Sequence, residues 1–219
     1  MKTPQLHCLD LAYETGVHLG DGCLQHYAPY DYRYAISGNR LNEQEYYRAT
    51  LSPLLHQLYD LNPGLCESHN SIFLYLYSKD LVLFKHETMG MPIGRKSQLG
   101  HLPDYVTAAE DKWVGQFLAG FYDTDGSVKL RRTLARDYPR ISIAQKMQGI
   151  ISDVKLLLWQ RFSISSTMYS NSYLDSRTGL REDRWFLDIN GHENFNRFML
   201  GIGTRSPYVL GRIALLELS

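Results

Sequence analysis

The chain has few of the features that define membrane, secreted or disordered proteins. Only three cysteines occur among its 219 residues, Cys8, Cys23 and Cys66, and no two of them form a CxxC pair. This count argues against a disulfide framework or a thiolate zinc site and fits a reducing cytoplasm. No apolar run approaches the roughly 18 residues of a membrane span. Charged side chains come too early for a signal peptide, so we expect a cytoplasmic protein with no membrane partner.

Net charge is also absent, because 23 Lys and Arg residues balance 23 Asp and Glu residues. A protein that binds nucleic acid is often basic, so this balance counts mildly against such a function. The charge is unevenly divided, however. Residues 1–108 carry 8 basic and 11 acidic residues, a net of −3, whereas residues 109–219 carry 15 and 12, a net of +3. A neutral total is therefore compatible with a basic groove on one side of the molecule.

The second half of the chain repeats a motif of the first half. LDLAYETGVHLGDGCL at residues 9–24 and WVGQFLAGFYDTDGSV at residues 113–128 both have a helical apolar pattern and end near Asp-Gly. The matched residues, all at an offset of 104, are Gly16 with Gly120, Gly20 with Thr124, Asp21 with Asp125, and Gly22 with Gly126. Self-similarity at a fixed spacing indicates two copies of one structural unit.

The segments after each motif also correspond. β-branched and aromatic runs predict hairpins, and apolar residues at helical spacing predict the helices. The first copy is predicted to contain a hairpin at 25–39, a helix at 42–60, strands at 65–69 and 72–78, and a helix at 80–88. The second copy is predicted to contain a hairpin at 127–146, a helix at 147–161, strands at 164–174 and 184–190, and helices at 192–200 and 207–217. Pro53 is expected to break or kink the helix at 42–60.

The predicted fold class is α+β, with the order αββαββα occurring twice. We place the first repeat at residues 1–91, a linker rich in Gly and Pro at 92–108, and the second repeat at 109–219.

Each motif helix carries small residues four positions apart, at 16 and 20 and at 120 and 124. Residues at this spacing share one face, and small side chains there allow two helix backbones to approach closely. We therefore expect the two motif helices to pack together through Gly16, Gly20, Gly120 and Thr124. Gly22 and Gly126 are expected to end the helices as left-handed caps.

This packing would bring Asp21 and Asp125 side by side at two negative helix ends, which is unfavourable without a cation. A small set of oxygen ligands favours Mg²⁺, and paired acids with Mg²⁺ are typical of phosphodiester hydrolysis. An isolated Asp-Gly after a helix is usually only a turn, so the duplication is the decisive feature. An EF-hand is excluded, because its first and twelfth loop positions would be Phe121 and Arg132.

LAGFYDTDG at residues 118–126 closely resembles the LAGLIDADG motif, and ETGVHLGDG at 14–22 is a looser second copy. MPIGRKSQ at 91–98 also resembles a stretch of archaeal intron-encoded members. The chain thus resembles a monomeric two-repeat LAGLIDADG homing endonuclease. Residue 1 is Met and the chain does not close on His-Asn, so we do not expect an intein.

The resemblance implies two four-stranded antiparallel sheets that form a saddle over double-stranded DNA. It implies a long, pseudo-palindromic target read in the major groove, with each strand cut near one motif carboxylate. Two or three divalent ions, taken as Mg²⁺, would be shared between Asp21, Asp125 and the cut phosphates, with Gly20 and Thr124 completing the metal site.

By the same resemblance, Gln145 would order the attacking water and Lys146 would lie near the cut phosphate. The matching positions of the first repeat are Gly38 and Asn39, which depart from the pattern. Lys79 and Lys96 are the candidates for the missing cation.

The hairpins carry residues suited to DNA contacts, since basic side chains bind phosphate or guanine and Tyr can donate to either. The candidates are Gln25, His26, Tyr30, Tyr32, Arg33, Tyr34, Arg40, Lys129, Arg131, Arg132, Arg136 and Arg140. The alternative is a solvated sheet face with ordinary strand-forming Tyr. At the level of function, the alternatives are an RNA-binding maturase that assists intron splicing and a DNA-binding regulator that does not cut.

Overall fold

The computed structural model describes residues 1–27, 31–132, 137–174 and 179–217. Two similar units follow one another and are joined by a segment with two short helices, η3 (Lys96–Gln98) and α5 (Asp104–Thr107). The first unit contains α1 (Leu9–Asp21), β1 (Gly22–Tyr27), β2 (Asp31–Asn39), α2 (Arg40–Glu45), η1 (Tyr46–Leu51), α3 (Ser52–Tyr59), β3 (Gly64–Glu67), β4 (Ser71–Tyr77), α4 (Lys79–Leu83) and η2 (Phe84–Thr88).

The second unit repeats this order. It contains α6 (Asp111–Asp125), β5 (Gly126–Arg131), β6 (Tyr138–Gln145), α7 (Gln148–Phe162), β7 (Thr167–Leu174), β8 (Arg181–Asn190), α8 (His192–Gly201) and α9 (Pro207–Glu217). The predicted α+β class and the doubled αββαββα order are confirmed. Within the described residues, no helix combines the length and the apolar character that a membrane span requires.

Each unit folds into one four-stranded antiparallel sheet. The strand orders are β1-β2-β4-β3 and β5-β6-β8-β7, so the two sheets have the same topology. Gly22 pairs with Ile36 in the first sheet, and Gly126 pairs with Ile143 in the second. These two pairs align the hairpins of the two repeats. In this alignment Gly38 of the first repeat corresponds to Gln145 of the second.

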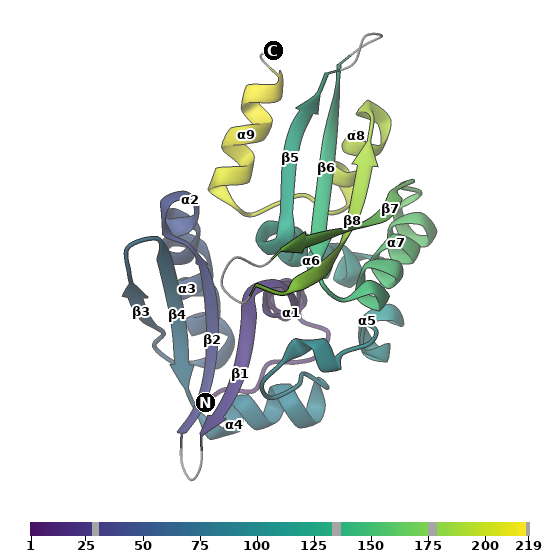
Figure 1. Cartoon of the computed structure of the whole chain (residues 1–219). Helices are drawn as coiled ribbons and strands as arrows, with labels where there is room; N and C mark the ends of the chain where they lie inside the picture. The colour runs from purple at the N-terminus through teal and green to yellow at the C-terminus, as the bar shows by residue number, and fades with distance from the viewer. Residues whose placement is uncertain (28–30, 133–136, 175–178, 218–219) are drawn as a thin grey trace.

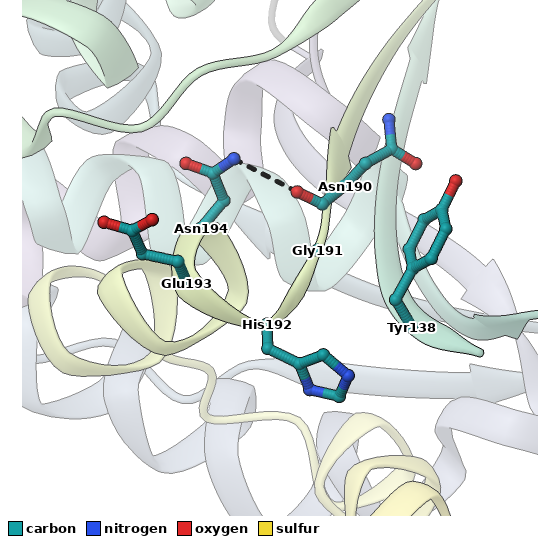
Figure 2. A pocket seen from close by; sticks show the side chains of 6 residues that line it. All are labelled: Tyr138, Asn190, Gly191, His192, Glu193 and Asn194. Atoms are coloured by element: carbon teal, nitrogen blue, oxygen red, sulfur yellow. Dashed lines mark hydrogen bonds between the residues drawn. The ribbon is translucent and has the colours of Figure 1, made fainter. Parts of the chain in front are cut away.

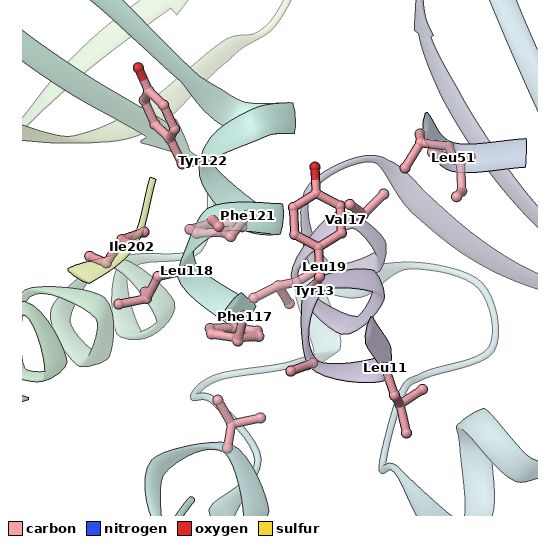
Figure 3. Packing of buried hydrophobic residues seen from close by; sticks show 14 of the residues in the cluster. Leu11, Tyr13, Val17, Leu19, Leu51, Phe117, Leu118, Phe121, Tyr122 and Ile202 are labelled. Carbon is pink, nitrogen blue, oxygen red and sulfur yellow. The ribbon is translucent and has the colours of Figure 1, made fainter. Parts of the chain in front are cut away.

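The motif helices α1 and α6 lie together at the centre of the molecule, with one sheet on either side (Figure 1). A Cβ atom added to Gly16 would overlap the Phe117 carbonyl, and one added to Gly120 would overlap the Tyr13 carbonyl. Buried side chains such as Phe121 surround this crossing (Figure 3). The close approach of two backbones therefore explains the glycines, as the spacing of small residues predicted.

The prediction of left-handed caps at Gly22 and Gly126 is wrong. Both glycines have extended backbone, with φ of −76° and −98°, and each begins a strand immediately after its helix. Their backbone N–H groups donate to His18 and Tyr122, respectively. A Cβ at Gly22 would come within 2.6 Å of the His18 Cα, so glycine is needed here for space rather than for positive φ.

The helix predicted at 42–60 is observed as the continuous series α2, η1 and α3. The chain stays helical through Pro53, which occupies the first turn of α3, and a π-helical segment at Tyr46–Leu51 precedes it. A π-turn is one of the usual ways to accommodate an interruption of the regular hydrogen-bond ladder.

A buried polar cluster joins the two units beside the helix pair. The Asp123 carboxylate accepts hydrogen bonds from the Tyr13 and Thr204 hydroxyls, and from the Arg205 backbone N–H at 2.8 Å. Burial raises the pKa of Asp123 to about 6, although these donors oppose the shift. The cluster fixes the C-terminal segment before α9 against the central helices.

Candidate active site at the ends of the motif helices

Asp21 and Asp125 are the last residues of α1 and α6, so the helix packing delivers both carboxylates to one region. Burial raises the pKa of Asp21 well above its ordinary value, and the nearby Asp125 and Glu43 charges raise it further. Burial also raises the pKa of Asp125 to about 7. Two acids with raised pKa values in one region mark a candidate catalytic site.

Lys96 reaches this region from the segment between the repeats. Its Nζ donates to the backbone carbonyls of His18 at 3.4 Å, Leu19 at 2.9 Å and Gly20. It thereby caps the C-terminal end of α1 and lowers the pKa values of both carboxylates. Burial lowers the pKa of Lys96, and the two acids oppose that shift. Of the two candidate lysines, the structure brings Lys96 to the carboxylates.

Lys79 lies elsewhere. It begins α4 directly after β4, and its Nζ is 5.8 Å from the centre of the Tyr32 ring. Gly22, the residue after Asp21, and Leu74 both pair with Ile36, so they lie side by side across the sheet. Lys79 follows Leu74 by five residues. At about 3.3 Å per residue, this places Lys79 roughly 15 Å away along the strand. The structure therefore does not bring Lys79 to the candidate site.

In the second repeat, the end of β6 supplies the polar groups near Asp125. The Gln145 Nε2 donates to the Asp125 carboxylate at 2.8 Å, and the Gln145 Oε1 accepts from the Lys146 backbone N–H at 2.8 Å. The Lys146 ammonium forms an ion pair with Glu182. Arg184 on β8 is a cation that the sequence did not indicate, and its charge lowers the pKa of Asp125.

The residues at this site fit a hard divalent cation. Two carboxylates converge there. Among the described residues no third His, Cys, Asp or Glu side chain joins them in a cluster that could hold a metal by protein ligands alone. Oxygen donors in small number suit Mg²⁺, which keeps waters and substrate phosphate in its shell. The Gly20 carbonyl accepts from Lys96 but retains a second lone pair. The Thr124 hydroxyl donates to the Gly120 and Phe121 carbonyls.

The first sheet has one face against the helices and one open face, and the pairing register divides the predicted DNA contacts between them. Tyr34 is fully buried on the helix side, where its hydroxyl donates to Glu14 at 2.5 Å. Tyr32 and His26 pair with each other on that same side, and their rings stack at 4.1 Å. The open face holds Gln25 and Arg33, whose side chains are hydrogen-bonded at 2.7 Å.

Sequence reasoning missed the residues of β3 and β4 on this open face. A hollow there is lined by Cys23, Gln25, Arg33, Ala35, Ser37, Cys66, Phe73, Tyr75 and Tyr77. Tyr75 and Tyr77 are aromatic groups that alternate with the buried Leu74 and Leu76. The strict two-residue alternation of β4 was the signal that could have identified them.

The second sheet carries predicted DNA-binding residues on its open face. Lys129 and Arg131 alternate with the buried Val128 and are exposed on the open face. Arg140 lies opposite Lys129 on that face, but its guanidinium forms an ion pair with Asp188 at 3.3 Å. Arg140 is therefore committed to a protein partner in this structure.

The remaining predicted contacts lie at the sheet margins. Arg40 begins α2 and forms an ion pair with Glu67 at 3.4 Å. Arg132 is exposed just after β5. Tyr30 and Arg136 lie outside the described residues.

A separate hollow lies at the other end of the second sheet (Figure 2). It is lined by Tyr138, Asn190, Gly191, His192, Glu193 and Asn194. The Asn194 side chain donates to the Asn190 carbonyl at 3.0 Å across its rim. Tyr138 and Gln145 are at opposite ends of β6, so this hollow is distinct from the carboxylate site.

The metal-free protein should be destabilised by ionisation of Asp125. The folded-state pKa of about 7 exceeds the ordinary value of 3.8, so the folded chain holds this proton more tightly than the unfolded chain. The resulting stabilisation is complete below the unfolded pKa and is lost as the pH rises through about 7. In EDTA at pH 8, Asp125→Asn should therefore be roughly 1–3 kcal/mol more stable than wild type, because it cannot ionise.

Urea unfolding at pH 4 and pH 8 measures this difference. Near pH 4 the two proteins should have nearly the same free energy of unfolding, because wild-type Asp125 is then protonated in the fold. Equal stabilities at both pH values would show that Asp125 carries no raised pKa.

Residues 112–203 match the LAGLIDADG-like domain family. One relative, a probable translation initiation factor IF-2 of Thermococcus kodakarensis, is 30% identical over 122 residues, or 56% of this chain. The aligned part spans only 9% of that protein's length.

Solved structures match over nearly the whole chain. Variants of the homing endonuclease I-DmoI match with a TM-score of 0.65 and 17% identity, covering 91% of this chain and 97% of theirs. I-DmoI in complex with DNA and Mn matches with a TM-score of 0.62 and 18% identity, covering 91% and 98%. The LAGLIDADG homing endonuclease I-GzeII in complex with its DNA target matches with a TM-score of 0.57 and 11% identity, covering 94% and 88%. Residues 112–203 of the second repeat thus match a LAGLIDADG-like domain, and the whole chain has the fold of the two-repeat LAGLIDADG homing endonucleases.

Proposed function

We propose that this protein is a divalent-metal-dependent endonuclease that cuts both strands of a specific DNA site. The observation that carries the proposal is the placement of Asp21 and Asp125 at the paired ends of α1 and α6, between two sheets with open polar faces. The solved relatives support it, since I-DmoI was crystallised with target DNA together with Mn or Ca, or in the presence of Mg.

Both halves of the site come from one chain, so we propose that a monomer with repeats 1–91 and 109–219, joined by 92–108, is the active form. Its three cysteines are unpaired, as expected of a cytoplasmic protein. We further propose that it is intron-encoded, on the motif resemblance alone.

In this proposal Asp21 and Asp125 hold the metal, helped by main-chain oxygens at Gly20 and Thr124. Bound Mg²⁺ would neutralise charge on the cut phosphate and favour ionisation of an attacking water. Gln145 hydrogen-bonds Asp125. In this proposal its amide would also orient the attacking water beside that carboxylate. Lys96 and Lys146 supply positive charge near the two carboxylates and near the phosphates they would face.

The open sheet faces would bind the DNA. The major groove admits a β-ribbon, and two sheets of equal topology suit a pseudo-palindromic site. Lys129 and Arg131 would contact phosphate in one half-site, whereas Gln25, Arg33 and Tyr75 would offer mostly neutral or internally bonded groups in the other. We therefore propose that the second repeat supplies most of the electrostatic affinity.

Selection of cleaved duplexes from a randomised library in Mg²⁺ tests the function directly. The proposal predicts recovery of one long site cut on both strands. Binding of a duplex without cutting would favour a regulator, and binding of structured RNA without any cut duplex would favour a maturase; either result would contradict the endonuclease.

The salt dependence of binding should reveal which residues face phosphate. Each phosphate contact contributes a slope of about −0.9 in log K against log salt, so Lys129→Ala with Arg131→Ala should flatten the slope by up to about 2 units. The matched control is Lys112→Ala with Lys155→Ala, two exposed lysines on α6 and α7. The measurement uses the selected duplex in Ca²⁺. An unchanged slope in the first variant would show that these side chains do not face the backbone.

A further inference from the structure

In the second repeat the Gln145 amide donates a hydrogen bond to the Asp125 carboxylate. The first repeat has no such amide at the corresponding position, Gly38. The paired positions Gly22–Ile36 and Gly126–Ile143 make Gly38 the structural counterpart of Gln145. Gln145 reaches Asp125, but Gly38 has no side chain with which to reach Asp21. The half-site at Asp21 therefore needs its polar group from another element.

The space beside Gly38 is filled by two side chains from the following helix. A Cβ atom on Gly38 would overlap the Glu43 carboxylate and would come within 2.6 Å of the Tyr47 hydroxyl. The side chains of Glu43 and Tyr47 pass directly over the Gly38 backbone, so a larger residue here would have to displace them. The space that the Gln145 side chain fills in the second repeat is filled in the first repeat by Glu43 of α2 and Tyr47 of η1.

Both side chains lie close enough to the carboxylate site to interact with it electrostatically. The Glu43 charge raises the pKa values of Asp21, Asp125 and Tyr47, and burial raises the pKa of Glu43 itself. Glu43 nevertheless forms no metal-ligand cluster with the two aspartates among the described residues. Its carboxylate is therefore near the metal acids but separate from them.

The Tyr47 hydroxyl is the second polar group beside Gly38. Its side chain is fully buried, and its hydroxyl has no hydrogen-bond partner in the described structure. A buried hydroxyl left unpaired costs about 1–3 kcal/mol, so such a group usually meets a water or a substrate atom. The Tyr47 hydroxyl and the Glu43 carboxylate flank the same backbone position at Gly38.

We propose that Glu43 is the general base of the first half-site and that Tyr47 helps it to hold the attacking water. The inference rests on the proposed endonuclease function. The water oxygen forms a bond to phosphorus while its proton passes to the Glu43 carboxylate. The bond from phosphorus to the leaving oxygen breaks, and that oxygen takes a proton from solvent. The two strands are then cut by chemically different half-sites, one served by Glu43 and the other by Gln145.

Glu43 also has a structural contact that the test must separate from catalysis. Its carboxylate accepts from the Asn39 backbone N–H at 2.6 Å, while the Asn39 side chain accepts from the Leu41 N–H at 2.9 Å. This reciprocal arrangement caps α2, and a glutamine can serve in such a cap as well as a glutamate. Glu43→Gln therefore keeps the cap and removes the base.

The experiment follows each strand of the selected duplex separately, with wild type, Glu43→Gln and the matched control Glu45→Gln from the exposed side of α2. Asp21→Asn and Asp125→Asn identify which strand each half-site cuts. Glu43→Gln should slow the Asp21 strand by about 10²-fold or more and leave the Asp125 strand at the wild-type rate. Gln145→Ala should have its main effect on the other strand.

The melting temperature of Glu43→Gln should be no lower than that of wild type, because the change keeps the cap and removes a charge that repels Asp21 and Asp125. Cutting of both strands by Glu43→Gln at wild-type rates would overturn the role of Glu43 and leave the endonuclease function intact. Equal slowing of both strands, with a lowered melting temperature, would also overturn it by showing a structural role. Failure of wild type to cut any duplex would instead overturn the proposed function itself.

Discussion

Exchanging Asp125 for Asn should give a protein that nicks its DNA site on one strand only. Asp21 and Asp125 belong to different helices, and Gln145 hydrogen-bonds Asp125, whereas the charges of Glu43 and Lys96 act on both carboxylates. Loss of one metal-binding carboxylate should slow its strand by roughly 10²–10³-fold, the scale found when one preorganised group is removed from an active site. Asp21→Asn should give the opposite nick.

Strand-specific cleavage under single-turnover conditions measures this effect. Asp111→Asn is the matched control, because it makes the same chemical change at the exposed start of the same helix. If Asp125→Asn slowed both strands equally, the two carboxylates would act as one shared centre, and the assignment of one acid to each strand would be wrong.

Gly120→Ala should destabilise the fold strongly although it adds only one methyl group. That methyl would overlap the Tyr13 carbonyl and lie 3.0 Å from the Val17 nitrogen, and backbone atoms of a packed helix cannot rotate away. We expect a loss of about 2–3 kcal/mol, the upper part of the overpacking range. For a chain of this size, this corresponds to a melting temperature lowered by roughly 5–10 °C.

Gly211→Ala is the control for the intrinsic effect of removing a helical glycine. Gly211 lies in α9, and a Cβ there would have no neighbour within 4 Å. Alanine should therefore stabilise α9 by up to about 1 kcal/mol through helix propensity. Thermal unfolding of both variants compares the two sites. A melting temperature for Gly120→Ala at or above the wild-type value would show that α1 and α6 do not meet at this residue.

The helix pair and the topology were predictable because they depend on local, repeated signals. Small residues at fixed spacing in two copies predicted the contact through Gly16 and Gly120 and the convergence of Asp21 and Asp125. The open and covered faces of the first sheet were not separated, because residue type without a strand register predicted Tyr32 and Tyr34 as DNA contacts. A one-residue shift in strand register moves every side chain to the other face of the sheet, and in the observed register Tyr34 is on the buried face.

The other missed residues depend on contacts between distant segments. Arg184 approaches Asp125 only through the pairing of β6 with β8, and Glu43 reaches the site only because Gly38 leaves space above β2. Neither residue belongs to a recognisable motif. Lys96 was one of two candidate lysines, and only the path of the connecting segment distinguishes it from Lys79.

The double variant Asp21→Asn/Asp125→Asn, assayed on the selected duplex, tests the central claim most directly. DNA binding is measured in Ca²⁺, and cleavage of both strands is then followed after exchange into Mg²⁺. The account predicts binding close to that of wild type, since the sheet faces are unchanged, and no detectable cleavage of either strand. Cleavage of both strands at the wild-type rate would show that the paired carboxylates at the ends of α1 and α6 are not the catalytic centre.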